Sequence, residues 1–190
     1  MHINTGNSRL AHHIFVANRL SLQIIQPVIP MTATIRPIQP SDNAVLAHII
    51  RTTLTEFGAN RPGTVFTDSA TDSLYSLFQQ RQAAYFVAEI DGQIVGGGGI
   101  FPTQGLPDDT CELVKMYLRP EARGIGLGKM IIGKCLQTAQ DLGFGQVYIE
   151  TMPELKKALT IYEKFGFEYL CAPLGNSGHF GCELWMLKKL

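Results

Sequence analysis

A glycine-rich turn separates an apolar run from a long amphipathic segment in this chain. The run from Cys111 to Leu118 is apolar on both faces apart from Glu112 and Lys115, which is typical of a central strand. The turn after it reads R-G-I-G-L-G-K, and apolar residues then recur at helical spacing as far as Gly143. Strand, turn and helix in this order bring unpaired amides and the positive end of a helix dipole together, which predicts an α/β fold with an anion site at the turn.

The turn fits neither of two common phosphate loops. The nucleoside-triphosphate loop needs a glycine five residues before the Gly-Lys pair and a Ser or Thr after it, where this chain has Arg123 and Met130. The dinucleotide pattern G-x-G-x-x-G also fails, because its last position falls on Lys129 when counted from Gly124 and on an isoleucine when counted from Gly126.

The rest of the chain mixes helix and strand patterns. We expect strands at 32–38, 84–90, 94–100, 146–151, 167–170 and 179–187, and helices from Asp42 to Gly58 and over about 71–80 and 154–165. Asp91-Gly92 predicts a tight hairpin between the second and third strands. Four consecutive glycines, Gly96 to Gly99, predict either a bulged strand or a close approach of neighbouring backbone or ligand.

Composition favours one folded domain. The chain has 190 residues, of which 45% are hydrophobic and 17% charged, as in ordinary globular proteins. Sixteen Lys and Arg balance sixteen Asp and Glu, which argues against a protein that binds nucleic-acid phosphates or anionic lipid. No apolar run approaches the length that spans a bilayer. We therefore expect a soluble, cytoplasmic protein with neither nucleic acid nor membrane as a partner.

The first thirty residues differ from the rest. Three arginines and no acidic residue precede Asp42, so the chain from Asp42 onward has a formal charge of −3. A transit peptide stays open, but the segment has few serines and ends in Pro27 and Pro30. We expect a poorly structured extension over 1–30 and a folded domain over 31–190, with Met31 as an alternative start.

The cysteines indicate neither a disulfide framework nor a metal site. Cys111, Cys135, Cys171 and Cys182 lack paired spacing, so we expect reduced and mostly buried thiols. His179 and Cys182 would supply only half of a zinc site, and no metal is expected.

Residues 123–128 follow the pattern R-x-x-G-x-G, which resembles the pyrophosphate loop of the GCN5-related N-acetyltransferase (GNAT) family. In that family consecutive amides and the arginine hold coenzyme A. The preceding E-L-V-K-M-Y-L-R-P is similar to the central strand of the family, and Ala158 to Phe167 are similar to its second signature. The resemblance covers about 32–190. Leu155 departs from it, because family members often carry an asparagine there that contacts the pantetheine arm.

The resemblance implies a fold and an activity. The fold would be a mixed sheet of about six to seven strands with a splayed parallel pair, flanked by about four helices. The activity would be transfer of an acetyl group from acetyl-CoA to a primary amine of a small molecule, by direct attack in a ternary complex. A protein N-terminal or lysine acetyltransferase and a non-catalytic acyl-CoA-binding module are the alternatives. A homodimer stays open as an assembly.

The resemblance also assigns residues. Strands 111–118 and 146–151 would form the splayed pair, and the amide of Met116 would polarise the acetyl carbonyl. Tyr162 would protonate the leaving thiolate, with a buried core phenol as the alternative. The cofactor-binding set would be Met116, Tyr117, Leu118, Arg123, Gly124, Ile125, Gly126, Leu127, Gly128 and Lys129.

Glu112 is the candidate general base. A lone carboxylate in an apolar strand is costly to bury and should have a raised pKa. Lys115 is not expected to face it, because positions i and i+3 point to opposite faces of a strand. The alternative is that Glu112 lies at the exposed beginning of the strand and orders only water or a loop.

The acceptor pocket is expected between two loops, 59–63 and 173–181. They offer Asn60, Arg61, Asn176 and His179 as substrate-binding candidates, although such residues are common in any turn. Arg61 would face a carboxylate of the acceptor.

Overall fold

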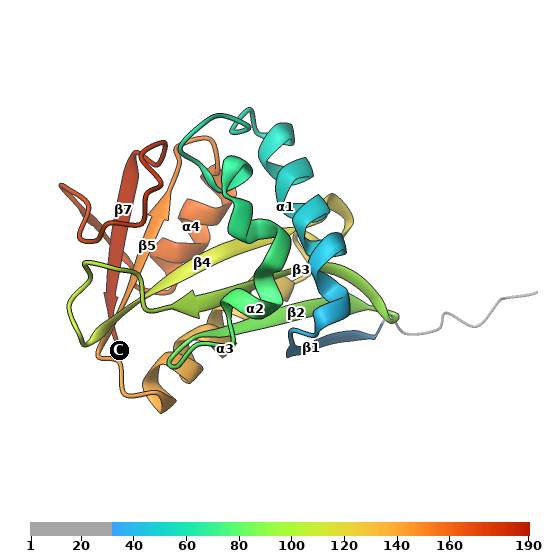
Figure 1. Ribbon diagram of the computed structural model, residues 1–190, viewed down its shortest axis with the longest axis horizontal. Helices are drawn as coiled ribbons and strands as arrows, with labels where there is room; N and C mark the ends of the chain where they lie inside the picture. The colour runs from blue at the N-terminus through green and yellow to red at the C-terminus, as the bar shows by residue number, and fades with distance from the viewer. Residues whose placement is uncertain (1–31) are drawn as a thin grey trace, which may run out of the picture. The chain divides into compact units, whose positions relative to one another are not determined.

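Seven strands form one mixed sheet in the computed structural model, which describes residues 32–190 (Figure 1). The strands are β1 (Ala33–Pro37), β2 (Ala84–Ile90), β3 (Gln93–Phe101), β4 (Thr110–Leu118), β5 (Gln146–Thr151), β6 (Glu168–Leu170) and β7 (Leu184–Lys189). Their spatial order is β1-β2-β3-β4-β5-β7-β6, and β4 and β5 run parallel while every other neighbouring pair in this sheet is antiparallel. The expected extension over 1–30 and the alternative start at Met31 lie outside the described residues.

Helices cover both faces of this sheet. One face carries α1 (Asn43–Glu56) and the short α2 (Leu74–Leu77), and the other carries α3 (Leu127–Asp141) and α4 (Lys156–Lys164) (Figure 1). Short 3₁₀ turns are η1 (Pro40–Asp42), η2 (Val65–Thr67), η3 (Ser69–Ser73) and η4 (Pro120–Ala122). Each face has its own apolar core. The mixed sheet, the parallel pair and the four helices confirm the expected fold class.

Local sequence signals place most element ends. Asp91 and Gly92 both adopt positive φ, +49° and +77°, as a two-residue hairpin requires.

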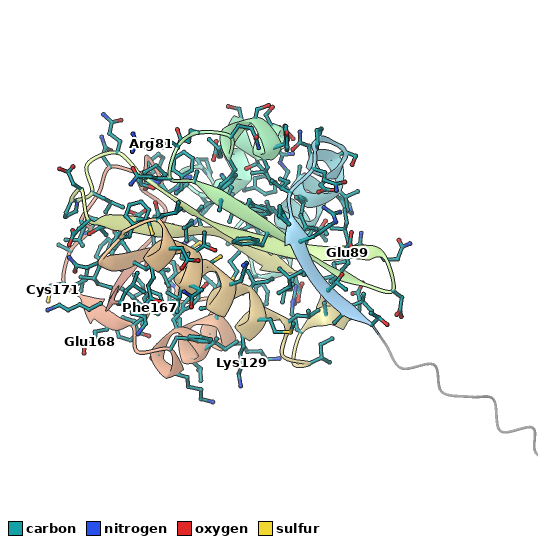
Figure 2. The ribbon with its side chains drawn as sticks, turned by 90° about the horizontal axis from the view of Figure 1, so that it is seen from below. Arg81, Glu89, Lys129, Phe167, Glu168 and Cys171 are labelled. Carbon is teal, nitrogen blue, oxygen red and sulfur yellow. The ribbon has the colours of Figure 1, made fainter. Side chains whose placement is uncertain are left out.

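In the described part of the chain no helix is long and apolar enough to cross a membrane. All four cysteines are free, as expected; Cys111 and Cys135 are buried and Cys182 is partly buried, whereas Cys171, just after β6, is exposed (Figure 2).

Two expected elements are shorter than their patterns indicate. The helix expected over 71–80 is the 3₁₀ turn η3 followed by the single turn of α2. The strand expected over 179–187 begins only at Leu184, because Gly178 has a φ of +79° and the amide of Cys182 donates to the carbonyl of His179, which makes a turn. His179 therefore lies in a loop.

The glycines of β3 make room for Tyr85. A Cβ at Gly97 would lie 2.6 Å from the Tyr85 ring, and one at Gly99 would lie 2.8 Å from it. The ring crosses β3 at these two residues, and its hydroxyl donates to the carbonyl of Lys115 on β4 at 3.0 Å. Against β2 the glycine strand carries one extra residue, because Gly96 pairs with Ala88 and Ile94 pairs with Glu89, which confirms the bulged strand.

Candidate active site

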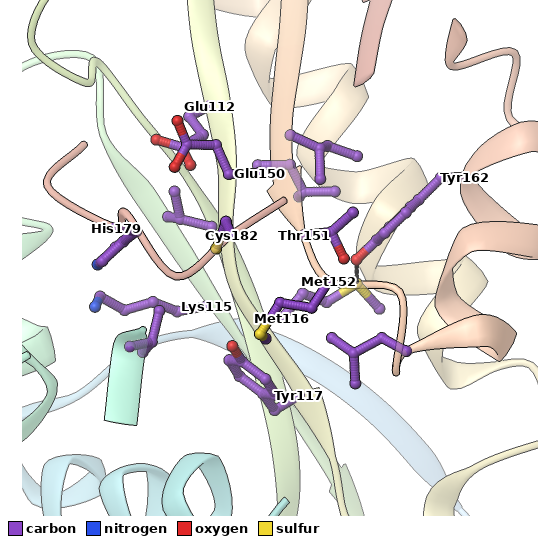
Figure 3. Close-up of a pocket in the computed structure, with 15 residues that line it drawn as sticks. Glu112, Lys115, Met116, Tyr117, Glu150, Thr151, Met152, Tyr162, His179 and Cys182 are labelled. Carbon is purple, nitrogen blue, oxygen red and sulfur yellow. Dashed lines mark hydrogen bonds between the residues drawn. The ribbon is translucent and has the colours of Figure 1, made fainter. Parts of the chain in front are cut away.

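The parallel strands β4 and β5 separate within the sheet. They are paired from Thr110 to Glu112 of β4 and diverge beyond that point. A cavity of about 40 Å³, the inter-strand cavity, lies between the diverging parts and is lined by Met116, Tyr117 and Tyr162 among others (Figure 3).

A larger space of about 480 Å³ adjoins it on the α1 face. This loop cavity is lined by parts of three loop segments, 63–70, 101–104 and 176–180, together with β4. Glu112, Val114, Lys115 and His179 line both cavities. These four residues therefore mark the junction at which the two spaces meet.

A bulge in β4 brings Lys115 to this junction. Lys115 has a φ of +51°, and neither it nor Met116 has a partner in the register with β3. The extra residue puts Val114 and Lys115 on the same face as Glu112, whereas Met116 packs against the opposite core. The expectation that Lys115 points away from Glu112 is therefore wrong, because strict alternation fails at a bulge.

Glu112 is a buried carboxylate with one hydroxyl partner. Its side chain is only 3% exposed, so the exposed-strand alternative is wrong. Burial raises its pKa to about 7, and the nearby Glu150 carboxylate adds to this rise. The hydroxyl of Thr103, which donates to Glu112, and the charges of His179 and Lys115 oppose it. Such a group changes protonation near neutral pH.

Lys115 and His179 share one carboxylate. The Lys115 ammonium pairs with Asp68, and Nε2 of His179 lies 3.7 Å from the same oxygen, Oδ2. Asp68 comes from the end of η2, and its other oxygen accepts from the amide of Ala70 at 2.9 Å. Hydrogen bonding to His179 and the Lys115 charge hold the pKa of Asp68 well below its usual range.

The sequence analysis missed Glu150 and Asp68. Glu150 on β5 lines the inter-strand cavity and accepts hydrogen bonds from the hydroxyls of Tyr148, at 3.0 Å, and Ser177. A usable signal for Glu150 was present, because it is the lone acidic residue of its strand, as Glu112 is of β4. Asp68 gave no such signal, because only the tertiary fold brings it to β4.

Two hydroxyl groups face the inter-strand cavity from β5 and α4. Tyr162 is 5% exposed, and its hydroxyl lies 4.0 Å from Sδ of Met116. Burial raises the pKa of Tyr162, so the phenol keeps its proton at neutral pH. Oγ1 of Thr151 is buried without a hydrogen-bond partner among the described residues. Figure 3 shows the oxygens of Tyr162 and Thr151 pointing toward the same space.

The glycine turn presents open backbone at the start of α3. Gly124 and Gly126 have φ of +81° and +97°, and no atom lies within 4 Å of a Cβ added at either. The Lys129 side chain points out from α3 (Figure 2). The backbone is therefore open at the N-terminal end of this 15-residue helix, where unpaired amides could meet an anion.

Arg123 has a different partner from the expected phosphate. Its Nε donates to the carbonyl of Leu118 at 2.9 Å, and its two terminal nitrogens donate to the carboxylate of Glu56 at 2.6 and 2.8 Å. The guanidinium also lies 5.2 Å from the centre of the Phe57 ring. Arg123 thus joins the end of α1 to the glycine turn in this structure.

The acceptor candidates divide into two groups. Asn176 and His179 line the loop cavity as expected. Asn60 and Arg61 line neither cavity. Arg61 instead pairs with Glu154 at 2.7 Å, so its expected role toward an acceptor carboxylate finds no support in this geometry.

Comparison with known proteins agrees with this architecture. The family profile described as Acetyltransferase (GNAT) family matches residues 50–167. The "Uncharacterized N-acetyltransferase YjgM" of Escherichia coli K12 is 39% identical over 164 residues, covering 86% of this chain and 98% of that protein. The chain therefore belongs to the GNAT acetyltransferase family.

Solved structures share the fold at low identity. A GNAT-family acetyltransferase from Staphylococcus aureus Mu50 has a TM-score of 0.74 at 16% identity, covering 83% of this chain and 99% of that one. PaiA N-acetyltransferase from Thermoplasma acidophilum, solved in complex with coenzyme A, has a TM-score of 0.65 at 17% identity, covering 84% and 100%.

Proposed function

We propose that this protein transfers the acetyl group of acetyl-CoA to a primary amine of a small molecule, by direct attack in a ternary complex. The observation that carries the proposal is the buried carboxylate of Glu112 at the junction of the two cavities. An amine in the loop cavity and a thioester in the inter-strand cavity would meet beside this group.

The residues fit acetyl-CoA. The open glycine turn at the start of α3 suits a pyrophosphate, and the inter-strand cavity has a buried hydroxyl, Thr151 Oγ1, without a partner among the described residues. The coenzyme A bound in the PaiA structure supports this use of the fold. When bound, acetyl-CoA supplies the thioester that reacts.

Each side chain then has a chemical task. Glu112 accepts the proton of the incoming ammonium, for which a pKa of about 7 is well matched. The amide of Met116, which lacks a partner in the β3 register, is our candidate donor to the acetyl oxygen. Tyr162 holds a proton beside Met116 and can give it to the departing sulfur.

A small acceptor is favoured over a peptide because hydrogen bonds fix the loop 173–181 to three other segments of the fold. The amide of Asn176 donates to the carbonyl of Gln104 at 2.8 Å, and that of Gly181 donates to the carbonyl of Gly63 at 2.7 Å. The hydroxyl of Ser177 binds Glu150. These bonds hold the loop across the loop cavity, where an extended peptide would need an open groove.

The test combines binding with turnover. Thermal shift is measured with acetyl-CoA, ATP and NAD, and thiol release is then followed with a panel of small amines and lysine peptides. We expect stabilisation by acetyl-CoA alone, by about 2.7 kcal/mol at about 100 times its dissociation constant, and thiol release with small amines. Tight binding without thiol release from any acceptor would favour the non-catalytic module, and preferred turnover of peptides would favour the protein acetyltransferase.

A further inference from the structure

We propose that the acceptor is a small amino acid whose carboxylate is held by Lys115 and His179 while its amine faces Glu112. The inference rests on the proposed function, because it names the acceptor class of the same site. Three features of the junction support it. Lys115 has N–H donors beyond the one that binds Asp68, Lys115 and His179 both lie against Asp68, and the carboxylates of Glu112 and Glu150 accept hydrogen bonds, among the described residues, only from uncharged hydroxyls.

Lys115 is a buried cation with unmet donors. The residue is 7% exposed and lines both cavities. An ammonium has three N–H donors, and Asp68 is the hydrogen-bond partner that the described part of the chain supplies to it. Its two remaining N–H groups bind neither a second carboxylate nor a carbonyl of the described residues, so they are available to an oxygen of a ligand in the loop cavity.

His179 adds a second nitrogen group beside Lys115. Both lie against one oxygen of Asp68, so a single carboxylate serves two side chains that can carry positive charge. Figure 3 shows the nitrogen ends of Lys115 and His179 on the same side of β4. A ligand carboxylate beside this cluster would offer further acceptor oxygens to the Lys115 ammonium and to Nε2 of His179.

The other side of the junction is acidic. Glu112 accepts from Thr103, and Glu150 accepts from Tyr148 and Ser177, so the hydrogen-bond partners of both carboxylates are hydroxyls without charge. An ammonium is the natural partner for such a pair. A positive group at Lys115 and a negative one at Glu112, three residues apart along β4, are complementary to a zwitterion.

This charge pattern distinguishes acceptor classes. An amino acid carries its carboxylate close to its amine, whereas a simple alkylamine, a lysine side chain and a protein N-terminus do not. The loop cavity of about 480 Å³ also leaves space for a side chain.

The experiment compares each L-amino acid with its own carboxamide, which keeps the amine and side chain but removes the negative charge. Affinity is measured calorimetrically on the protein saturated with coenzyme A, and kcat/KM is measured by thiol release with acetyl-CoA. For at least one side chain we expect the acid to exceed the amide by about tenfold or more in both quantities.

Variants then assign the preference to Lys115. Lys115→Met should bring the acid-to-amide ratio close to one, and His179→Leu should lower it severalfold. Lys164→Met, which changes an exposed lysine on α4, should keep the wild-type ratio. If Lys115→Met only disturbed the structure, it would lower the values for the acid and for the amide by the same factor and leave their ratio unchanged. The melting temperature of the variant would then be reduced as well.

Other outcomes overturn the inference or separate it from the proposed function. Equal values for acids and amides throughout, or no detectable binding of any amino acid, would overturn it, as would an unchanged ratio in the folded Lys115→Met protein. A preference for acids in binding without any thiol release would uphold the carboxylate site and refute the acetyl transfer.

Discussion

Glu112 links the pH dependence of catalysis to a single buried carboxylate. A base must be deprotonated to act, and burial holds the pKa of Glu112 at about 7, so kcat/KM should rise with pH through about 7. Glu112→Gln should remove this limb and lower the rate by about 10²-fold. Initial rates from pH 5.5 to 9 measure both effects; a limb that persists in the variant would assign it to another group.

The same carboxylate should leave a mark on stability. Its folded-state pKa lies above its ordinary value of 4.5, so the stability it contributes is present at low pH and is lost as pH rises through about 7. Between pH 5 and pH 8 the wild type should therefore lose on the order of 2–3 kcal/mol relative to Glu112→Gln. Denaturant unfolding of both proteins at the two pH values gives this difference, and parallel losses would contradict the burial of a charged form.

Glu56 forms an ion pair with Arg123, the arginine that the family resemblance assigns to the pyrophosphate of coenzyme A. The pair is partly exposed, 23% at Arg123 and 40% at Glu56, so it should contribute little to stability. Glu56→Gln should free Arg123 and tighten coenzyme A binding by about threefold, while changing the unfolding free energy by less than about 1 kcal/mol.

A matched control exists for this variant. Asp72 forms the same two-point contact with Arg51, at 2.6 and 2.8 Å, and neither residue lines a cavity. Asp72→Asn should leave coenzyme A affinity unchanged in the same calorimetric titration. Weaker binding in Glu56→Gln would show instead that the pair holds the turn in its binding shape.

At the scale of single elements, β3 depends on its lack of side chains. A Cβ at Gly97 would meet the carbonyl of Phe86 and the ring of Tyr85, both at 2.6 Å, so Gly97→Ala should destabilise the protein by about 2 kcal/mol or more. Gly133→Ala is the control, because nothing lies within 4 Å of its Cβ in α3 and alanine favours a helix, for a gain of about 0.5–1 kcal/mol. Thermal denaturation should move in opposite directions for the two.

Elements whose signals are local could be predicted from the sequence. The Asp91-Gly92 hairpin and β5 at Gln146–Thr151 lie where their patterns indicate. The bulge at Lys115 could not be predicted, because no local turn signal marks it and the carbonyl of Lys115 is bound by Tyr85 from another strand. The sequence pattern predicts a strand over the loop before β7, because the turn there depends on Gly178 and on a backbone hydrogen bond of His179 and not on a break in hydrophobicity.

The site follows the same division. Glu112 stands out in the sequence as a lone carboxylate in an apolar strand, whereas Tyr162 stands out only through its resemblance to the tyrosine of the second family signature. Asp68 lies 47 residues before the Lys115 that it binds, and Glu150 faces Glu112 only because β4 and β5 are neighbours in the sheet. Partners of this kind are set by topology.

For the whole described domain, β4 and β5 are the seam between two parts of the sheet. Their ladder covers three residue pairs, and the amides beyond it lack partners across the seam. Acetyl-CoA bound there should slow hydrogen exchange in 113–118 and 149–152 more than in the β1–β2 ladder. Mass spectrometry of exchange with and without the ligand measures this; uniform protection would point to global stabilisation alone.

The 173–181 loop lines the loop cavity but carries none of the groups that we assign to proton transfer. Its middle and its end are fixed by main-chain hydrogen bonds, from Asn176 to Gln104 and from Gly181 to Gly63, which most sequences could make. Its side chains line the loop cavity, whereas Glu112 and Met116 belong to β4. Replacement of this one short segment would therefore reshape a wall of the loop cavity without altering the groups on β4 that move the proton or hold Asp68.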